Sequence, residues 1–255
     1  MTGKTHRLGG MLCSLIGFSV LKSKGMLLPD VNNLIQLAVI YPYGVWASTA
    51  SDLDQNPESS PSKDVISSCI NKALHLTTKR YQYLDEKLDY KKKKYSIEYK
   101  VSKLLSANHR SWQTHSFEVL LLIIYLTILS MKGAIFIGLG STDYAILSLI
   151  FTGISFGLIA HYALDMLTPE GIWCLTFVAI NKALSLVYHR HIEVLPKKVH
   201  LVPYAEFFCT DGTWERIIRF ILKTITPIYL LYFVLSTYTP NVWHSIYNVL
   251  SVLFK

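Results

Sequence analysis

The chain has 255 residues, of which 51% are hydrophobic and only 16% charged, and its mean hydropathy is +0.32. This composition is too apolar for an ordinary soluble domain. Because the apolar residues form long blocks, the sequence predicts an all-α integral membrane protein, a helical bundle with four or five spans. The four cysteines show no CxxC pairing, which disfavours a disulfide scaffold and a zinc ribbon.

The N-terminal part predicts a helical hairpin with polar residues at both outer ends. A short apolar segment, 8–21, follows the basic opening MTGKTHRLGG, which contains His6. No small-residue cleavage site follows, so we expect this segment to be retained. The segment 34–50 is a borderline span with Pro42 inside, and Asp52 and Asp54 come directly after it in SDLDQNP.

Most of the net charge of +8 comes from one polar region. Between Lys63 and Arg110 we count twelve Lys/Arg and five Asp/Glu, so this region contributes +7. The positive-inside rule predicts that it lies in the cytoplasm. Apolar residues at helical spacing over 64–76 predict an amphipathic helix. We interpret about 58–105 as a basic helical insertion in a single 1–255 domain. Its lysine run, 91–94, fits anionic lipid, nucleic acid or a solvated surface.

Two further spans are predicted at 119–138 and 144–164, and each has histidines at one end. HRSWQTHS, with His109 and His115, precedes the first span, and HYALDMLTPEGI, with His161 and Asp165, ends the second. Residues four apart on a helix leave the same face, so His161 and Asp165 form a pair. The pair is either a metal site or a polar helix end before Pro169.

The remaining segments are a weaker span at 217–238, which begins just after Glu215 and contains Pro227, and an interfacial or re-entrant helix at 242–254. If the basic region lies in the cytoplasm and each predicted span crosses the membrane once, all the polar motifs lie at the same membrane face. The residues that we expect to share the cytoplasmic face are His6, Asp52, Asp54, His109, Arg110, His115, His161, Asp165 and Glu215.

In this order the motifs resemble the YdjM-type family of inner-membrane, metal-dependent hydrolases. The resemblance rests on THRLGG, SDLDQNP, HRSWQTHS, HYALDMLTPEGI and TDGTWERI and covers most of the chain. Ser51 stands where the family pattern usually has proline, and the interval before HRSWQTHS is longer than expected. LLPDVNN offers Asp30 as a competing aspartate, but SDLDQNP supplies two carboxylates.

The resemblance implies a metal site. Its ligands would be His6, Asp52, His109, His115, His161 and Asp165, enough for two or more ions. Zn²⁺ fits these ligands best, and Mn²⁺ and Fe²⁺ stay open. The catalytic candidates are Asp54, Arg110 and Glu215. Asp54 could alternatively orient a histidine, and Arg110 could lie at the membrane interface. Glu215 could be a first-turn residue that the helix dipole favours.

The family is distantly similar to zinc-dependent phospholipase C and P1-type nucleases, which implies phosphoester hydrolysis, with a small molecule or a lipid headgroup as substrate. Two other functions remain open. The metal could be purely structural, or the protein could be a membrane adaptor that binds anionic lipid or nucleic acid through its basic insertion. The expected location is the inner membrane, with several spans and the site facing the cytoplasm.

Overall fold

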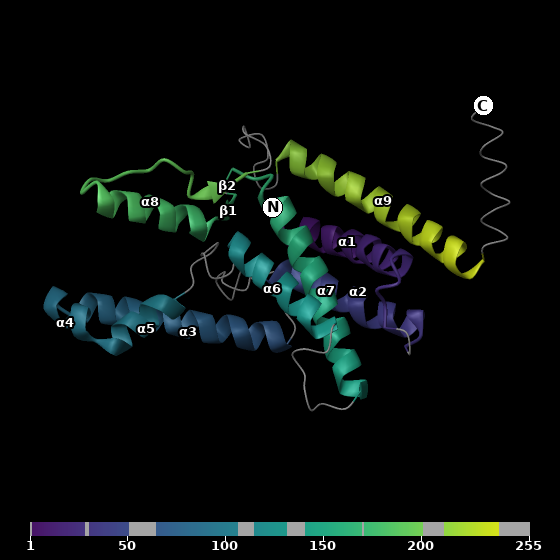
Figure 1. Cartoon of the computed structure of the whole chain (residues 1–255), viewed down its shortest axis with the longest axis horizontal. Helices are drawn as coiled ribbons and strands as arrows, with labels where there is room; N and C mark the ends of the chain where they lie inside the picture. The colour runs from purple at the N-terminus through teal and green to yellow at the C-terminus, as the bar shows by residue number, and fades with distance from the viewer. Residues whose placement is uncertain are drawn as a thin grey trace.

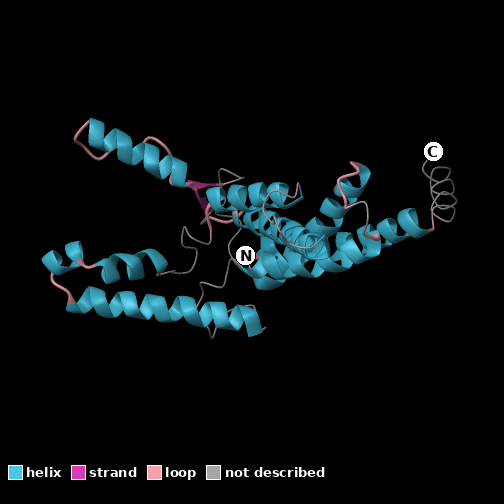
Figure 2. Cartoon of the chain, turned by 60° about the horizontal axis from the view of Figure 1, so that its bottom comes forward, coloured by secondary structure: helices cyan, strands magenta, loops and turns pink. Residues whose placement is uncertain are grey.

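A computed structural model describes residues 2–28, 31–50, 65–106, 115–131, 141–169, 171–200 and 212–239. These residues are mostly helical (Figure 2). The helices are α1 Gly3–Ser23, α2 Asn33–Ala50, α3 Val65–Lys87, α4 Tyr90–Tyr95, α5 Ile97–Leu105, α6 Phe117–Met131, α7 Ser141–Asp165, α8 Leu175–Val187 and α9 Thr213–Tyr238. Strands β1 Ile172–Trp173 and β2 Lys198–Val199 pair antiparallel.

The centre of the protein is the group of helices α1, α2 and α7, with α6 packed on α7 and α9 on α1 (Figure 1). Small residues line the α2–α7 contact. A Cβ added at Gly44 would lie 3.2 Å from the backbone oxygen of Gly153 and would overlap the Ser14 hydroxyl. Close backbone approach through glycine and serine is typical of helices packed within a membrane.

Two described helices are long and apolar enough to cross a membrane, by length and composition. They are Asp143–Asp165 in α7 and Thr213–Thr237 in α9, which match the spans predicted at 144–164 and 217–238. The segments 8–21 and 34–50 lie in α1 and α2, and α2 and α9 continue through their prolines. The described part of 119–138 ends at Met131, and 242–254 lies outside the described residues. The number of spans, four or five, therefore stays a prediction.

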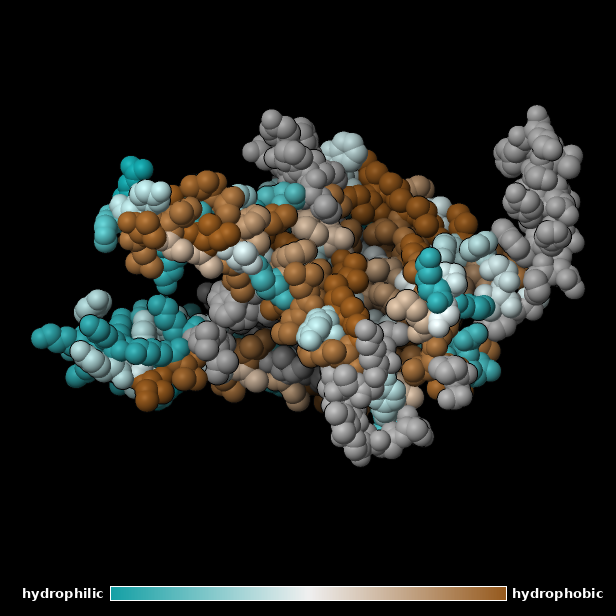
Figure 3. Space-filling view, viewed as in Figure 1, coloured by the Kyte–Doolittle hydropathy of each residue, from teal (hydrophilic) through white to brown (hydrophobic). Residues whose placement is uncertain are grey.

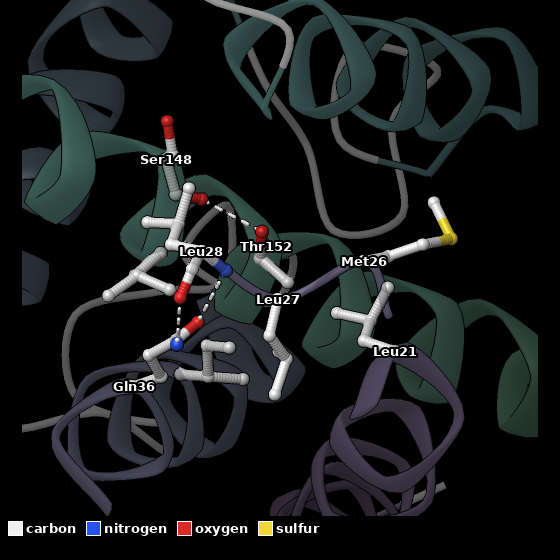
Figure 4. Close-up of a pocket in the computed structure, with 9 residues that line it drawn as sticks. Leu21, Met26, Leu27, Leu28, Gln36, Ser148 and Thr152 are labelled. Atoms are coloured by element: carbon white, nitrogen blue, oxygen red, sulfur yellow. Dashed lines mark hydrogen bonds between the residues drawn. The ribbon is translucent and has the colours of Figure 1, made fainter. Parts of the chain in front are cut away.

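A buried glutamine fixes the turn between α1 and α2. The Gln36 amide nitrogen donates to the carbonyls of Leu28 and Val31 at 2.8 and 2.7 Å, and its oxygen accepts from Leu28 N at 3.1 Å. Figure 4 shows the bonds between Gln36 and Leu28 beside a small cavity that Leu21, Met26 and Thr152 also line. A side chain that satisfies the main chain of the turn holds α2 antiparallel to α1.

Two arms project from the bundle on the side where α1 begins (Figures 1 and 2). One arm is α3 with α4 and α5 folded back along it, joined by ion pairs Lys93–Asp85 at 2.8 Å and Arg80–Glu98 at 2.5 Å. The helical prediction for 64–76 is confirmed, because α3 covers 65–87. The other arm is α8. Figure 3 shows hydrophilic residues over the α3–α5 arm and hydrophobic residues over α8 and α9.

Candidate metal centre

Four predicted ligands from three parts of the chain meet at one end of the bundle. His6 lies in the first turns of α1, His115 directly precedes α6, and His161 and Asp165 end α7. Because α1 and α6 both pack on α7, their N-terminal ends lie beside the C-terminal end of α7. The structure therefore brings together residues that are far apart in the sequence.

The Asp165 carboxylate lies at the centre of this group. Its Oδ1 is 3.4 Å from His6 Nε2, and its Oδ2 is 3.4 Å from His115 Nε2 and 3.0 Å from His161 Nε2. The Nε2 atoms of His115 and His161 are 3.1 Å apart. The rings of His6 and His161 stack with their centroids 4.0 Å apart. Three imidazoles thus surround one carboxylate, His6 at Oδ1 and the other two at Oδ2.

The arrangement of His161 indicates which of its nitrogens can bind a metal. Its Nδ1 lies 2.7 Å from the carbonyl oxygen of Ser48 in α2. A carbonyl only accepts, so Nδ1 carries the proton and the Nε2 of the neutral ring presents a lone pair to the group. A hydrogen bond to the second ring nitrogen is a common feature of metal-binding histidines.

The four residues are 0% exposed. Among the residues that the structure describes, His6, His161 and Asp165 each offer one ligand atom, and these atoms lie within 4.8 Å of one another. Burying charged and polar groups at the end of apolar helices costs free energy unless the groups are hydrogen-bonded, paired or bound to a metal. Burial and shared geometry both mark this cluster as a functional candidate.

The sequence as a whole matches a family model described as YdjM inner membrane protein, over residues 1–252. The chain belongs to the YdjM family. No curated protein and no solved structure matches it. The family assignment supports a membrane location for this YdjM protein, and the two candidate spans agree with it.

A parallel β-bridge between the segment before α6 and strand β1 holds His115 in position in this YdjM protein. Trp173 of β1 donates its main-chain N–H to the carbonyl of His115 at 2.8 Å, and Ser116 forms a β-bridge with Trp173. The Ser116 hydroxyl accepts from Val119 N at 3.3 Å and caps the start of α6. The position of His115 therefore depends on a strand that follows α7.

Glu215 lies in the first turn of α9 and is 0% exposed. Its Oε1 accepts from Thr2 N, Thr2 Oγ1 and Thr5 Oγ1, each at 2.6 Å, and lies 3.2 Å from Arg219 Nη2. These bonds join the beginning of α9 to the beginning of α1, next to His6. The interpretation of Glu215 as a catalytic residue stays a prediction, and its contacts show a role in holding the two helices together.

Four predicted site residues lie outside the described residues: Asp52, Asp54, His109 and Arg110. The main-chain carbonyl of Ser48, which orients His161, was not predicted from the sequence. Every residue has a carbonyl, so no residue type could have signalled this role.

Proposed function

We propose that this YdjM protein is a membrane-bound, metal-dependent hydrolase. The observation that carries the proposal is the fully buried group of His6, His115, His161 and Asp165 at the end of the bundle. We infer further that the protein spans the inner membrane several times, with this end facing the cytoplasm as its basic insertion indicates.

The spacing of the ligand atoms fits a bound metal ion. Metal–ligand bonds of about 2.1 Å at tetrahedral angles separate neighbouring ligand atoms by about 3.4 Å. The separation is 3.4 Å between His6 and Oδ1 of Asp165, and 3.0 and 3.4 Å between Oδ2 and His161 and His115. One ligand atom each of His6, His161 and Asp165 lies within 4.8 Å of the others. The donor set of imidazoles and carboxylate, without thiolate, suits Zn²⁺, with Mn²⁺ and Fe²⁺ as alternatives.

When bound, a divalent metal supplies Lewis acidity that makes water a nucleophile near neutral pH. The protein's own groups hold the site: Ser48 orients His161, and Asp165 provides negative charge at the centre of the cluster. In the reaction proposed, a water oxygen forms a bond to phosphorus and the P–O ester bond breaks. The leaving oxygen takes a proton that the water gives up. We propose a phosphoester as the substrate class because the family resemblance implies one, through the distant similarity to phospholipase C and P1-type nucleases that we expect from the sequence.

A structural metal is the second candidate function. A catalytic metal site keeps an open coordination position, whereas a structural metal site is closed. The 0% exposure of all four residues favours a closed site. Of the other predicted contributors, Asp54 and Arg110 would supply catalytic groups, and both lie outside the described residues. Turnover of a phosphoester therefore separates the two functions, whereas metal content does not.

The first experiment measures metal content by elemental mass spectrometry on detergent-purified protein. We expect at least one Zn²⁺ or Mn²⁺ per chain, lost in both His161→Ala and His115→Ala. His191→Ala is the matched control, because His191 is exposed beyond the end of α8, and it should keep the metal.

The same preparations are then assayed with bis-para-nitrophenyl phosphate, a water-soluble phosphodiester. Hydrolysis that follows the metal content would support the hydrolase. Bound metal without turnover of this or any phospholipid would leave a structural metal site, and absence of metal after reconstitution would refute both metal functions. An adaptor would then remain, and its function would depend on Lys91–Lys94.

A further inference from the structure

A cavity of about 490 Å³ lies between the C-terminal turns of α1 and α9, far from the metal cluster. Its lining comes from residues 19–23 of α1 and residues 229–237 of α9. Lys22 follows His6 by 16 positions on the same helix, which is about 24 Å at 1.5 Å per residue. The cavity is therefore a separate site at the opposite end of these two helices.

Lys22 is the charged residue of the cavity lining. Its Nζ donates to Thr237 Oγ1 at 3.2 Å and lies 6.0 Å from the centre of the Phe233 ring, so the ammonium is held between the two helices. Phe233 is buried and packs edge-on against Phe18 of α1. The lysine side chain thus has a defined place at the cavity, with two further N–H donors on its ammonium.

The charge of Lys22 is not balanced by a carboxylate of the two helices that form the cavity. As the structure describes them, α1 contains no Asp or Glu, and the one acidic residue of α9 is Glu215. Glu215 lies about 33 Å from Thr237 along the helix. A lysine in the last turn of α1 also suits the helix dipole, but the dipole does not account for the polar cavity around it.

Hydroxyl groups form most of the remaining lining. They belong to Ser19, Ser23, Tyr229, Tyr232, Ser236 and Thr237.

These hydroxyl groups provide both donors and acceptors. The serine hydroxyls donate to carbonyls of their own helices at 2.9 to 3.2 Å, so their oxygens serve as acceptors. The Thr237 oxygen accepts from Lys22, so its own O–H can donate. The cavity therefore suits a ligand that combines an anionic group with alcohol groups.

The polarity of the cavity changes along the two helices in the way that a membrane surface does. Thr237 ends the candidate span of α9, and Lys22 lies beside it. Val20 and Phe233 line the cavity about a turn or less deeper, and Leu231 on α9 is 60% exposed. Tyrosines are enriched at this depth of a bilayer. In Figure 3, hydrophilic residues gather where α1 ends, next to the hydrophobic surface over α9.

We propose that this cavity binds the headgroup of an anionic phospholipid that carries alcohol groups, as phosphatidylglycerol does. The phosphate accepts from Lys22 and Thr237, the headgroup hydroxyls donate to the serine oxygens, and the acyl chains follow the exposed apolar side of α9. The lipid contacts α1 and α9 together at the membrane face opposite the cluster. This binding does not depend on the proposed hydrolase function.

The test measures lipid binding to the detergent-purified full chain by native mass spectrometry. Lys22→Gln removes the charge with little change in length, and Lys22→Arg keeps the charge. Lys24→Gln is the matched control, because Lys24 is exposed two positions further along the chain and does not line the cavity.

We expect phosphatidylglycerol to bind wild type and Lys22→Arg, and to bind Lys22→Gln about fivefold or more weakly. Lys24→Gln should bind like wild type. Phosphatidylcholine, whose headgroup carries a positive charge and no alcohol, should bind wild type about fivefold or more weakly than phosphatidylglycerol does. Glycerol 3-phosphate, which has no acyl chains, should not bind at the same concentrations.

Photochemical labelling locates the bound lipid. Phosphatidylglycerol with a photoactivatable headgroup should label residues 19–23 and 229–237 in wild type and in Lys24→Gln, and this labelling should fall in Lys22→Gln.

Three results would overturn the inference. Equal lipid binding in wild type and Lys22→Gln, or an equal loss in Lys24→Gln, would show that Lys22 only adds charge at the membrane surface. Equal binding of phosphatidylcholine would remove the preference for an anionic headgroup. Binding of glycerol 3-phosphate as tight as that of the lipid would show that the ligand is a soluble phosphate ester.

Discussion

The buried Glu215 carboxylate offers the sharpest test of how the cluster end is held together. Its Oε1 accepts three hydrogen bonds of 2.6 Å from Thr2 and Thr5. Hydrogen bonds to a charged group contribute about 1.5–3 kcal/mol each, but they are not additive, and removing one partner of a buried pair costs about 3–5 kcal/mol. We therefore expect Glu215→Ala to lower the free energy of unfolding by about 4 kcal/mol. That is a large share of a typical total of about 5–15 kcal/mol.

The assay is denaturant unfolding in mild detergent, followed by tryptophan fluorescence. Thr224→Ala is the control on the same helix, because Thr224 is exposed and should change stability by less than about 0.5 kcal/mol. Glu215→Gln keeps the size and should lose about half as much as Glu215→Ala. If Glu215→Ala unfolds like Thr224→Ala, the hydrogen-bond network does not hold α9 to α1. A fully stable Glu215→Gln without turnover would instead support a catalytic role.

Two further predictions concern the arms. Asn181 Oδ1 accepts from Val194 N and Leu195 N, both at 3.0 Å. Asn181→Ala should therefore lower the local stability of this segment by about 1–3 kcal/mol. Amide hydrogen exchange at Val194 and Leu195 should become faster, while the amides of α7 stay protected. Equal protection in both proteins would contradict this role. The ion pair with Lys93, and then the hydrogen bond from Tyr99, hold the pKa of Asp85 below its ordinary value of 3.8. At pH values above the ordinary pKa of Asp85, the lowered pKa adds to the stability of the folded arm. This contribution is lost as the pH falls through the lower pKa of the folded state. NMR titration should show the Asp85 pKa rising in Lys93→Ala but not in Lys94→Ala.

The meeting of His115, His161 and Asp165 was predictable because each lies at the boundary of an apolar block, His115 before one and the other two at the end of the next. The four-residue spacing placed His161 and Asp165 on one face, and threading the spans brought the other motifs to the same end. The Thr2–Glu215 bond was not predictable, because its partners are 213 positions apart and a first-turn glutamate also fits a helix dipole alone. The β1–β2 pair was missed because two-residue strands carry no periodic signal.

The candidate site is assembled from the beginning and the later parts of the chain, which gives its formation an order in time. Glu215 is made 210 positions after Thr5, about 10–40 s later at about 5–20 residues per second. During that interval α1 carries His6 and Thr5 without the groups that later surround them, so this end of α1 stays near water or lipid headgroups. A metal ion can join all four residues only after α7 has been inserted. Capture of the proposed metal would therefore be a late step of biogenesis, and a nascent chain that stops before α7 would not be stabilised by it.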